Sequence, residues 1–105
     1  MGLPEGRYVY NGLPYEVRGG TARYLDGTLI GTALGLNQLI RRFQSFTGCP
    51  LATAVRAASH NPACVLGIQE RTGSLEPGKD ADLALLNDDF TVWKTMKRGR
   101  FIYES

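Results

Sequence analysis

The feature that most constrains the fold of this chain is a series of paired turn residues in its first thirty positions. Asn11-Gly12, Gly19-Gly20 and Asp26-Gly27 are pairs that connect adjacent strands, because glycine adopts positive φ without a Cβ clash. The short segments between them are rich in aromatic and β-branched residues: 7–10, 14–18 and 21–25. This alternation predicts a small antiparallel meander.

The pattern changes at Gly31-Thr32, where helical spacing replaces the short strands. Thr32 is the predicted N-cap of a first helix, and Gly48 is its predicted C-terminal stop. The apolar residues that recur at this spacing form one stripe along the helix. They are Leu36, Leu39, Ile40, Phe43 and Phe46.

Two shorter helices are expected next. Pro50 suits the first turn of the second helix, because its missing N–H costs nothing there. Asn61-Pro62 ends that helix and begins a third, which Asn61 caps and Gly67 closes.

The last part of the chain returns to strands. An apolar run at 83–86 precedes the segments 90–97 and 100–103, which Arg98-Gly99 joins as a terminal hairpin. The order of strands, then two to three helices, then antiparallel strands indicates an α+β fold.

The length of 105 residues suits one compact unit. It comprises three segments, 1–31, 32–72 and 73–105.

Charge and hydropathy exclude several functions. The formal net charge of +2 is too small to indicate nucleic-acid or membrane-surface binding. No apolar run approaches the roughly 20 residues of a membrane span, and the N-terminus lacks the basic and apolar regions of a signal peptide. We therefore expect a cytoplasmic protein. The densest basic group, Lys97, Arg98 and Arg100, is interpreted as a solvated hairpin.

The metal-ligating residues are too few for a zinc site. Cys49, Cys64 and His60 are the chain's only cysteines and histidine, and they form no closely spaced pairs. The thiols are expected to be buried and free rather than joined in a disulfide. His60 can be read as a base or ligand, but a lone histidine at a helix end more often bonds the last carbonyls. No nucleophile accompanies it, so we predict no catalytic residue and no metal site.

Two carboxylate groups and one loop leave alternatives open. Asp80 and Asp82 share one face of an extended segment, which suits acid–base chemistry or, preferably, a turn that bonds backbone N–H groups. Asp88-Asp89 is interpreted as a solvated turn. The segment 28–32 runs from a strand towards the predicted helix start. Its backbone N–H groups either hold an anion or polar ligand, or belong to an ordinary capped helix.

Three stretches together resemble one family. Residues 25–32, Leu-Asp-Gly-Thr-Leu-Ile-Gly-Thr, resemble the Asp-Gly-Thr-Leu-x-Gly-Ser/Thr loop of N-acetylglucosamine-6-phosphate deacetylases. Residues 54–63 are similar to the helix and Asn-Pro-Ala turn that close many amidohydrolase barrels. Residues 73–83 resemble the Gly-x-(Leu/Ile)-x-x-Gly-x-x-Ala-Asp-Leu pattern that follows the barrel in that superfamily. The first stretch, with residues 2–8, points to the deacetylase branch.

The resemblance covers this whole chain but about the last quarter of such an enzyme, since a full barrel alone needs roughly 250 residues. It implies that residues 32–67 belong to the exterior of a TIM barrel and the last strands to a small β-sandwich. Leu29, Ile30 and Gly31 match the loop that contacts the amino-sugar phosphate substrate. The family's catalytic aspartate and the ligands of its divalent metal, such as zinc, have no counterpart here.

Three hypotheses follow. The first is a C-terminal fragment of such a deacetylase, inactive alone. The alternative is a stand-alone interaction or sugar-phosphate-binding module that kept this part of the fold. The weakest hypothesis is a distinct small enzyme, because the sequence offers no set of residues that could form a catalytic site. In the isolated chain the apolar strand faces of residues 81–103 would lack their usual cover, so we expect the chain either to self-associate through those faces or to rearrange them.

Overall fold

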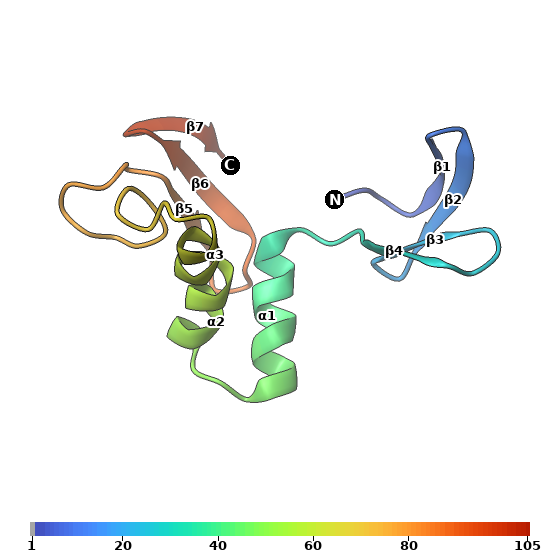
Figure 1. The fold of residues 1–105 in the computed structure, drawn as a ribbon, viewed down its shortest axis with the longest axis horizontal. Coiled ribbons are helices and arrows are strands. Elements are labelled where there is room, and N and C mark those ends of the chain that lie inside the picture. The colour runs from blue at the N-terminus through green and yellow to red at the C-terminus, as the bar shows by residue number, and fades with distance from the viewer. Residues whose placement is uncertain (1) are drawn as a thin grey trace. The chain divides into compact units, whose positions relative to one another are not determined.

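The computed structural model describes residues 2–105 and divides them into two compact units (Figure 1). The first unit ends at Leu36, and the second is Asn37–Ser105. Met1, with which the predicted segment 1–31 begins, lies outside the described residues. That the three predicted segments fold as a single unit in solution stays a prediction, which unfolding measurements can test.

The first unit contains the predicted meander, a four-stranded antiparallel sheet in the order β1-β2-β3-β4. Asn11 and Gly12 both have positive φ, 50° and 76°, so the turn between β1 and β2 matches the twist of its strands. The strands are β1 (Gly6–Tyr10), β2 (Leu13–Arg18), β3 (Thr21–Tyr24) and β4 (Leu29–Thr32).

A small buried cluster holds this sheet together. Tyr8 stacks on Tyr15 with ring centroids 5.5 Å apart, and Ile30 of β4 packs against the same cluster. Burial of these side chains stabilises the meander. The buried members are Tyr15, Val17, Ala22 and Ala33.

Three helices follow: α1 (Leu36–Thr47), α2 (Leu51–Ala58) and α3 (His60–Val65). The predicted closing residues, Gly48 and Gly67, follow α1 and α3 with positive φ.

Two predicted caps are wrong. Thr32 ends β4, because its hydroxyl donates to the Gly20 carbonyl at 3.2 Å and accepts from the Leu34 N–H, so α1 begins four residues later. Asn61 lies inside α3, which starts at His60.

The chain ends in a three-stranded antiparallel sheet, β5-β6-β7, which confirms the predicted strands and the α+β class. The strands are β5 (Leu83–Leu86), β6 (Val92–Lys97) and β7 (Arg100–Glu104). Arg98 and Gly99, with φ of 47° and 75°, form the predicted hairpin turn.

The second unit buries little. Among its described residues the buried side chains are Ala54 and Ala63, and α1 has none, so its apolar stripe stays partly or fully exposed. The loop after α3 packs closely at Gly73: a Cβ there would lie 2.7 Å from the Ala63 Cβ. No helix within residues 2–105 combines the length and apolar character that a membrane crossing needs.

Candidate functional site

The three predicted substrate-contacting residues lie together in β4, an edge strand of the first sheet. Leu29 pairs with Arg23 and Gly31 with Ala22, and a register irregularity leaves Ile30 between them. The side of β4 away from β3 has no strand partner in the described chain. Whether these residues bind substrate stays a prediction.

The three residues present different surfaces. The Leu29 side chain is 58% exposed, whereas Ile30 packs against the buried cluster. Apart from Gly31 itself and its two chain neighbours, no atom of residues 2–105 lies within 4 Å of the position that a Cβ on Gly31 would occupy. The strand therefore offers one apolar side chain beside bare backbone, an arrangement that can contact a ligand closely. The helix start expected here is absent, because Ala33, Leu34 and Gly35 separate β4 from α1.

The turn that leads into β4 is shaped by Asp26. Its carboxylate accepts a hydrogen bond from the Thr28 N–H at 2.9 Å, and Arg23 donates to the Gly27 carbonyl at 3.0 Å. The hydrogen bonds from Thr28 hold the pKa of Asp26 below its ordinary value. This carboxylate fixes the entry into β4 and is not a free acid–base group.

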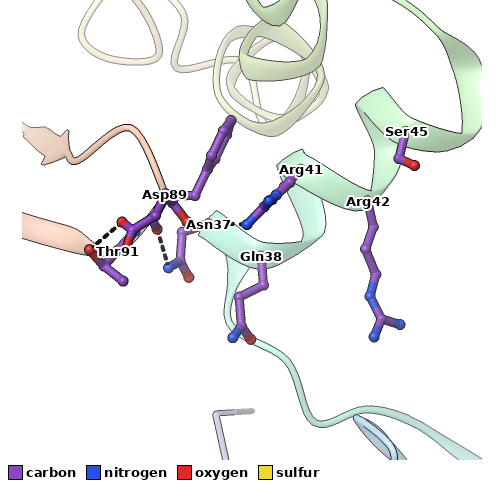
Figure 2. Close-up of a pocket in the computed structure, with 8 residues that line it drawn as sticks. Asn37, Gln38, Arg41, Arg42, Ser45, Asp89 and Thr91 are labelled. Carbon is purple, nitrogen blue, oxygen red and sulfur yellow. Dashed lines mark hydrogen bonds between the residues drawn. The ribbon is translucent and has the colours of Figure 1, made fainter.

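The second unit has a polar pocket of about 390 Å³ between α1 and the turn after β5. Figure 2 shows Arg41 directed towards Asp89 and Arg42 extending away from it. The Asn37 amide donates to the Phe90 carbonyl at 2.8 Å, and Arg41 reaches the Asp89 carbonyl at 3.5 Å. The lining residues are Asn37, Gln38, Arg41, Arg42, Ser45, Asp89, Phe90 and Thr91.

The carboxylate in this pocket, that of Asp89, already accepts two hydrogen bonds. Asp89 accepts from the Thr91 hydroxyl at 2.6 Å and from the Thr91 N–H at 2.9 Å, which lowers the pKa of Asp89. The Asp88-Asp89 segment is thus the predicted turn. The hydrogen bonds from Asn37 and Arg41 to backbone carbonyls attach α1 to this turn. No pattern in the sequence indicates the contact between Asn37 and Phe90, which lie 53 residues apart.

A shallower groove of about 370 Å³ lies at the junction of α2 and α3. Glu76 accepts from the Ser74 hydroxyl at 2.8 Å and pairs with Lys79 at 2.5 Å. The bonds from Lys79 first and Ser74 second hold the pKa of Glu76 below its ordinary value. The lining residues are Ala52, Val55, Arg56, Ser59, His60, Gly73, Ser74 and Glu76.

His60 and Cys64 differ from their predicted roles. His60 begins α3 rather than bonding the last carbonyls of a helix, and its Nε2 lies 3.3 Å from the Cys64 Sγ. Cys64 is exposed and Cys49 is half-buried, so the expectation of buried thiols is wrong. Both cysteines are free, as predicted.

Asp80 and Asp82 serve separate contacts. Asp80 pairs with Arg71 at 3.3 Å, whereas Asp82 binds the Lys97 ammonium and accepts from the Arg98 N–H at 2.7 Å. Those bonds, the one from Lys97 first, lower the pKa of Asp82. The structural interpretation of the pair therefore agrees with the geometry, although Asp82 bonds a distant hairpin rather than its own turn.

The described residues do not fit a divalent metal. Across residues 2–105 no three His, Cys, Asp or Glu side chains gather closely enough to hold one. A metal centre needs three or four such ligands. No step through a metal follows from this chain.

Comparison with known proteins gives consistent matches. N-acetylglucosamine-6-phosphate deacetylase from Bacillus subtilis is 40% identical over 99% of this chain. The structure of N-acetylglucosamine-6-phosphate deacetylase from Thermotoga maritima matches with a TM-score of 0.84 and 35% identity, covering 99% of this chain and 28% of that one. A third match is a mutant of the Mycobacterium smegmatis deacetylase in complex with N-acetyl-D-glucosamine-6-phosphate. Its TM-score is 0.80 and its identity 33%, and the match covers 95% of this chain and 27% of that one.

The chain spans about a quarter of the length of the curated relatives that it matches, 26% for the Bacillus subtilis protein. It is therefore homologous to that portion of these deacetylases, and its α+β fold is the fold of the same portion of their structures. The model of the amidohydrolase family matches residues 19–102. The chain belongs to the amidohydrolase family.

Proposed function

We propose that this chain is the C-terminal portion of a metal-dependent N-acetylglucosamine-6-phosphate deacetylase and has no activity by itself. The observation that carries the proposal is the extent of the match, which covers 99% of this chain but only 26% of the Bacillus subtilis deacetylase. In addition, residues 2–105 hold no metal-binding cluster. The complete enzyme hydrolyses the amide of an N-acetyl amino-sugar phosphate in the cytoplasm. The divalent metal and the catalytic aspartate come from the rest of the protein.

Within that enzyme, Leu29, Ile30 and Gly31 contact the amino-sugar phosphate. Support comes from their position in an edge strand, with Leu29 exposed and open space at Gly31. Ile30 contributes through its backbone, since its side chain packs inward. The core contact of Ile30 fixes the strand, so that its two neighbours meet the ligand at a set position.

A chimera tests this role. In it, this chain replaces the matching quarter of the Bacillus subtilis deacetylase, and turnover of N-acetylglucosamine-6-phosphate is measured. We expect activity, and we expect Leu29→Asp to raise KM because a carboxylate repels the sugar phosphate. Leu25→Asp is the matched control, since Leu25 is 59% exposed and Leu29 58%. A folded but inactive chimera, or equal effects of the two substitutions, would contradict the assignment.

The second candidate is a stand-alone interaction or sugar-phosphate-binding module. The self-contained cluster around Tyr15 favours it, since the first unit has packing of its own. An immunoblot of cells that make the protein discriminates the two candidates. A band of about four times the length of this chain, scaled from the 26% coverage, supports the enzyme portion. A band of 105 residues supports the module.

The isolated chain associates with a second copy through its last sheet. β7 is an edge strand whose five residues are all exposed, including Ile102 at 65%. Antiparallel pairing of two β7 strands about Ile102 places Arg100 of each copy opposite Glu104 of the other, so the charges are complementary. Exposed edge strands pair readily in this way.

Light scattering with size exclusion tests this association. We expect dimers or larger species, and we expect Ile102→Lys to reduce them because two lysines then face each other across the pairing. Leu75→Lys, at an 82% exposed loop position, is the control and leaves association unchanged. A monomer at high concentration contradicts the proposal.

A further inference from the structure

Arg23 ties strand β3 to the turn that leads into β4. Its guanidinium donates from Nη1 to the Gly27 carbonyl at 3.0 Å. The backbone of the turn adds two bonds of 2.9 Å, from the Gly27 N–H to the Tyr24 carbonyl and from the Tyr24 N–H to the Thr28 carbonyl. Together these bonds set the path by which the chain enters Leu29, the first residue of β4.

Hydrogen bonds rather than packing hold this turn. Residues 25–28 are all exposed. Apart from its own chain neighbours, no atom of residues 2–105 lies within 4 Å of the position that a Cβ on Gly27 would occupy. A turn without buried contacts opens easily, so the loss of the bond from Arg23 should loosen it.

Arg23 lies on the same face of the first sheet as Leu29. The two residues are directly opposite each other across β3 and β4, and opposite residues share a face. Ala22, the neighbour of Arg23 in β3, belongs to the buried cluster, so this face is turned away from the core. Glu16, which lies opposite Arg23 in β2, pairs with Arg18 at 3.2 Å and so does not draw the Arg23 guanidinium from the turn.

We propose that Arg23 is a positioning residue of the deacetylase, whose bond to the Gly27 carbonyl sets where Leu29 meets the amino-sugar phosphate. This role rests on the proposed function, in which β4 contacts the substrate. Arg23 acts through the backbone of residues 27–29 rather than by touching the ligand. Its bond serves the bound substrate and the transition state alike, so its loss raises KM and leaves kcat unchanged.

The chimera with the Bacillus subtilis deacetylase measures this role. We expect Arg23→Met to raise KM for N-acetylglucosamine-6-phosphate by about fivefold with little change in kcat, a size that suits one hydrogen bond from a charged group at an exposed position. Arg23→Lys can still donate to the Gly27 carbonyl and should restore most of the loss. A merely structural role would reduce the folded fraction, which lowers the apparent kcat without moving KM.

Arg7→Met is the matched control for charge. Arg7 is exposed and lies opposite Glu16 in β1, on the same face as Arg23 but away from the turn. We expect its KM to equal that of the unsubstituted chimera. Equal rises in KM for Arg7→Met and Arg23→Met, or no rise for Arg23→Met in an active chimera, would overturn the positioning role while the proposed function stands. A folded but inactive chimera would overturn the proposed function and the role of Arg23 with it.

Amide hydrogen exchange in the isolated chain tests the local step without catalysis. The Gly27 N–H bonds the Tyr24 carbonyl and the Thr28 N–H bonds the Asp26 carboxylate, so both report opening of the turn. We expect both to exchange faster in Arg23→Met than in wild type, and at the wild-type rate in Arg7→Met. Unchanged exchange in Arg23→Met would contradict the role of Arg23 whatever the chimera shows.

Discussion

The two units of this chain reach similar sheets through different packing. The first buries Tyr15, Val17 and two alanines within a four-stranded meander, whereas the longer second unit buries Ala54 and Ala63. Burial therefore does not follow length here. It depends on whether the described residues contain the element that faces each apolar surface.

The second unit leaves many of its large apolar side chains exposed. Its helices and strands carry large side chains that face solvent, while its tight contacts involve turns and loops, such as Gly73 against α3. Monomeric proteins rarely leave such surfaces contiguous and uncovered. Examples are Phe46 of α1, Val65 of α3 and Ile102 of β7.

Removing the central ring of the first unit should have the largest effect. Tyr15→Ala takes a 93%-buried ring out of the cluster and from its stack with Tyr8, so we expect a loss of about 3 kcal/mol or more. Amide hydrogen exchange reports each unit separately, and the loss should appear in residues 2–36. Tyr10→Ala, at 60% exposure, is the control. Equal losses from both variants would mean that the first unit has no real core.

A methyl group at Gly73 tests the loop contact of the second unit. Gly73→Ala must fit a Cβ at φ +94° and 2.7 Å from the Ala63 Cβ, so we expect a loss of about 2 kcal/mol. Gly78→Ala has a similar φ, +91°, but open space, so its loss should be about 1 kcal/mol. Denaturant unfolding gives both values. A larger loss at Gly78 would show that this loop is not packed.

The pH dependence of the last hairpin is a smaller effect. Lys97 and the Arg98 N–H hold the pKa of Asp82 below its ordinary value, so the ionised carboxylate stabilises the folded state. That stability is present above the unfolded pKa and is lost as pH falls through the lower folded pKa. Asp82→Asn should remove this share of the acid sensitivity, measured by exchange in β6 and β7. Asp88→Asn is the control, and an unchanged acid profile for Asp82→Asn would be the contrary result.

The smallest effect is expected at the exposed stripe of α1. Phe46 is 82% exposed, so Phe46→Ser should change the free energy of unfolding by less than about 0.5 kcal/mol. Thermal unfolding of the isolated chain measures this change. A substantial loss would show that α1 is covered in solution, which would remove the contrast between the units.

The strands were predictable because their signals are local. The hairpins β1-β2, β2-β3 and β6-β7 have a two-residue turn between short β-rich runs, and positive φ at positions such as Asn11 and Arg98 is a property of the turn itself. The start of α1 was not predictable. The Thr32 hydroxyl donates to the carbonyl of Gly20, twelve residues earlier, and so continues the sheet.

The sites were predictable to a smaller extent for the same reason. The separation of four between His60 and Cys64 implies contact only once both lie in one helix, and the cap expected at Asn61 placed the helix start after His60. The Asn37–Phe90 contact joins distant segments and leaves no pattern in the sequence. The position of Leu29–Gly31 came from a family resemblance rather than from periodicity.

The most direct test of the account is the deacetylation of N-acetylglucosamine-6-phosphate by the purified 105-residue chain, with and without added zinc. The account predicts no turnover in either condition, because residues 2–105 lack a metal-binding cluster. Zinc-dependent turnover that is lost on chelation and survives further purification would contradict it, since the chain would then hold a complete site.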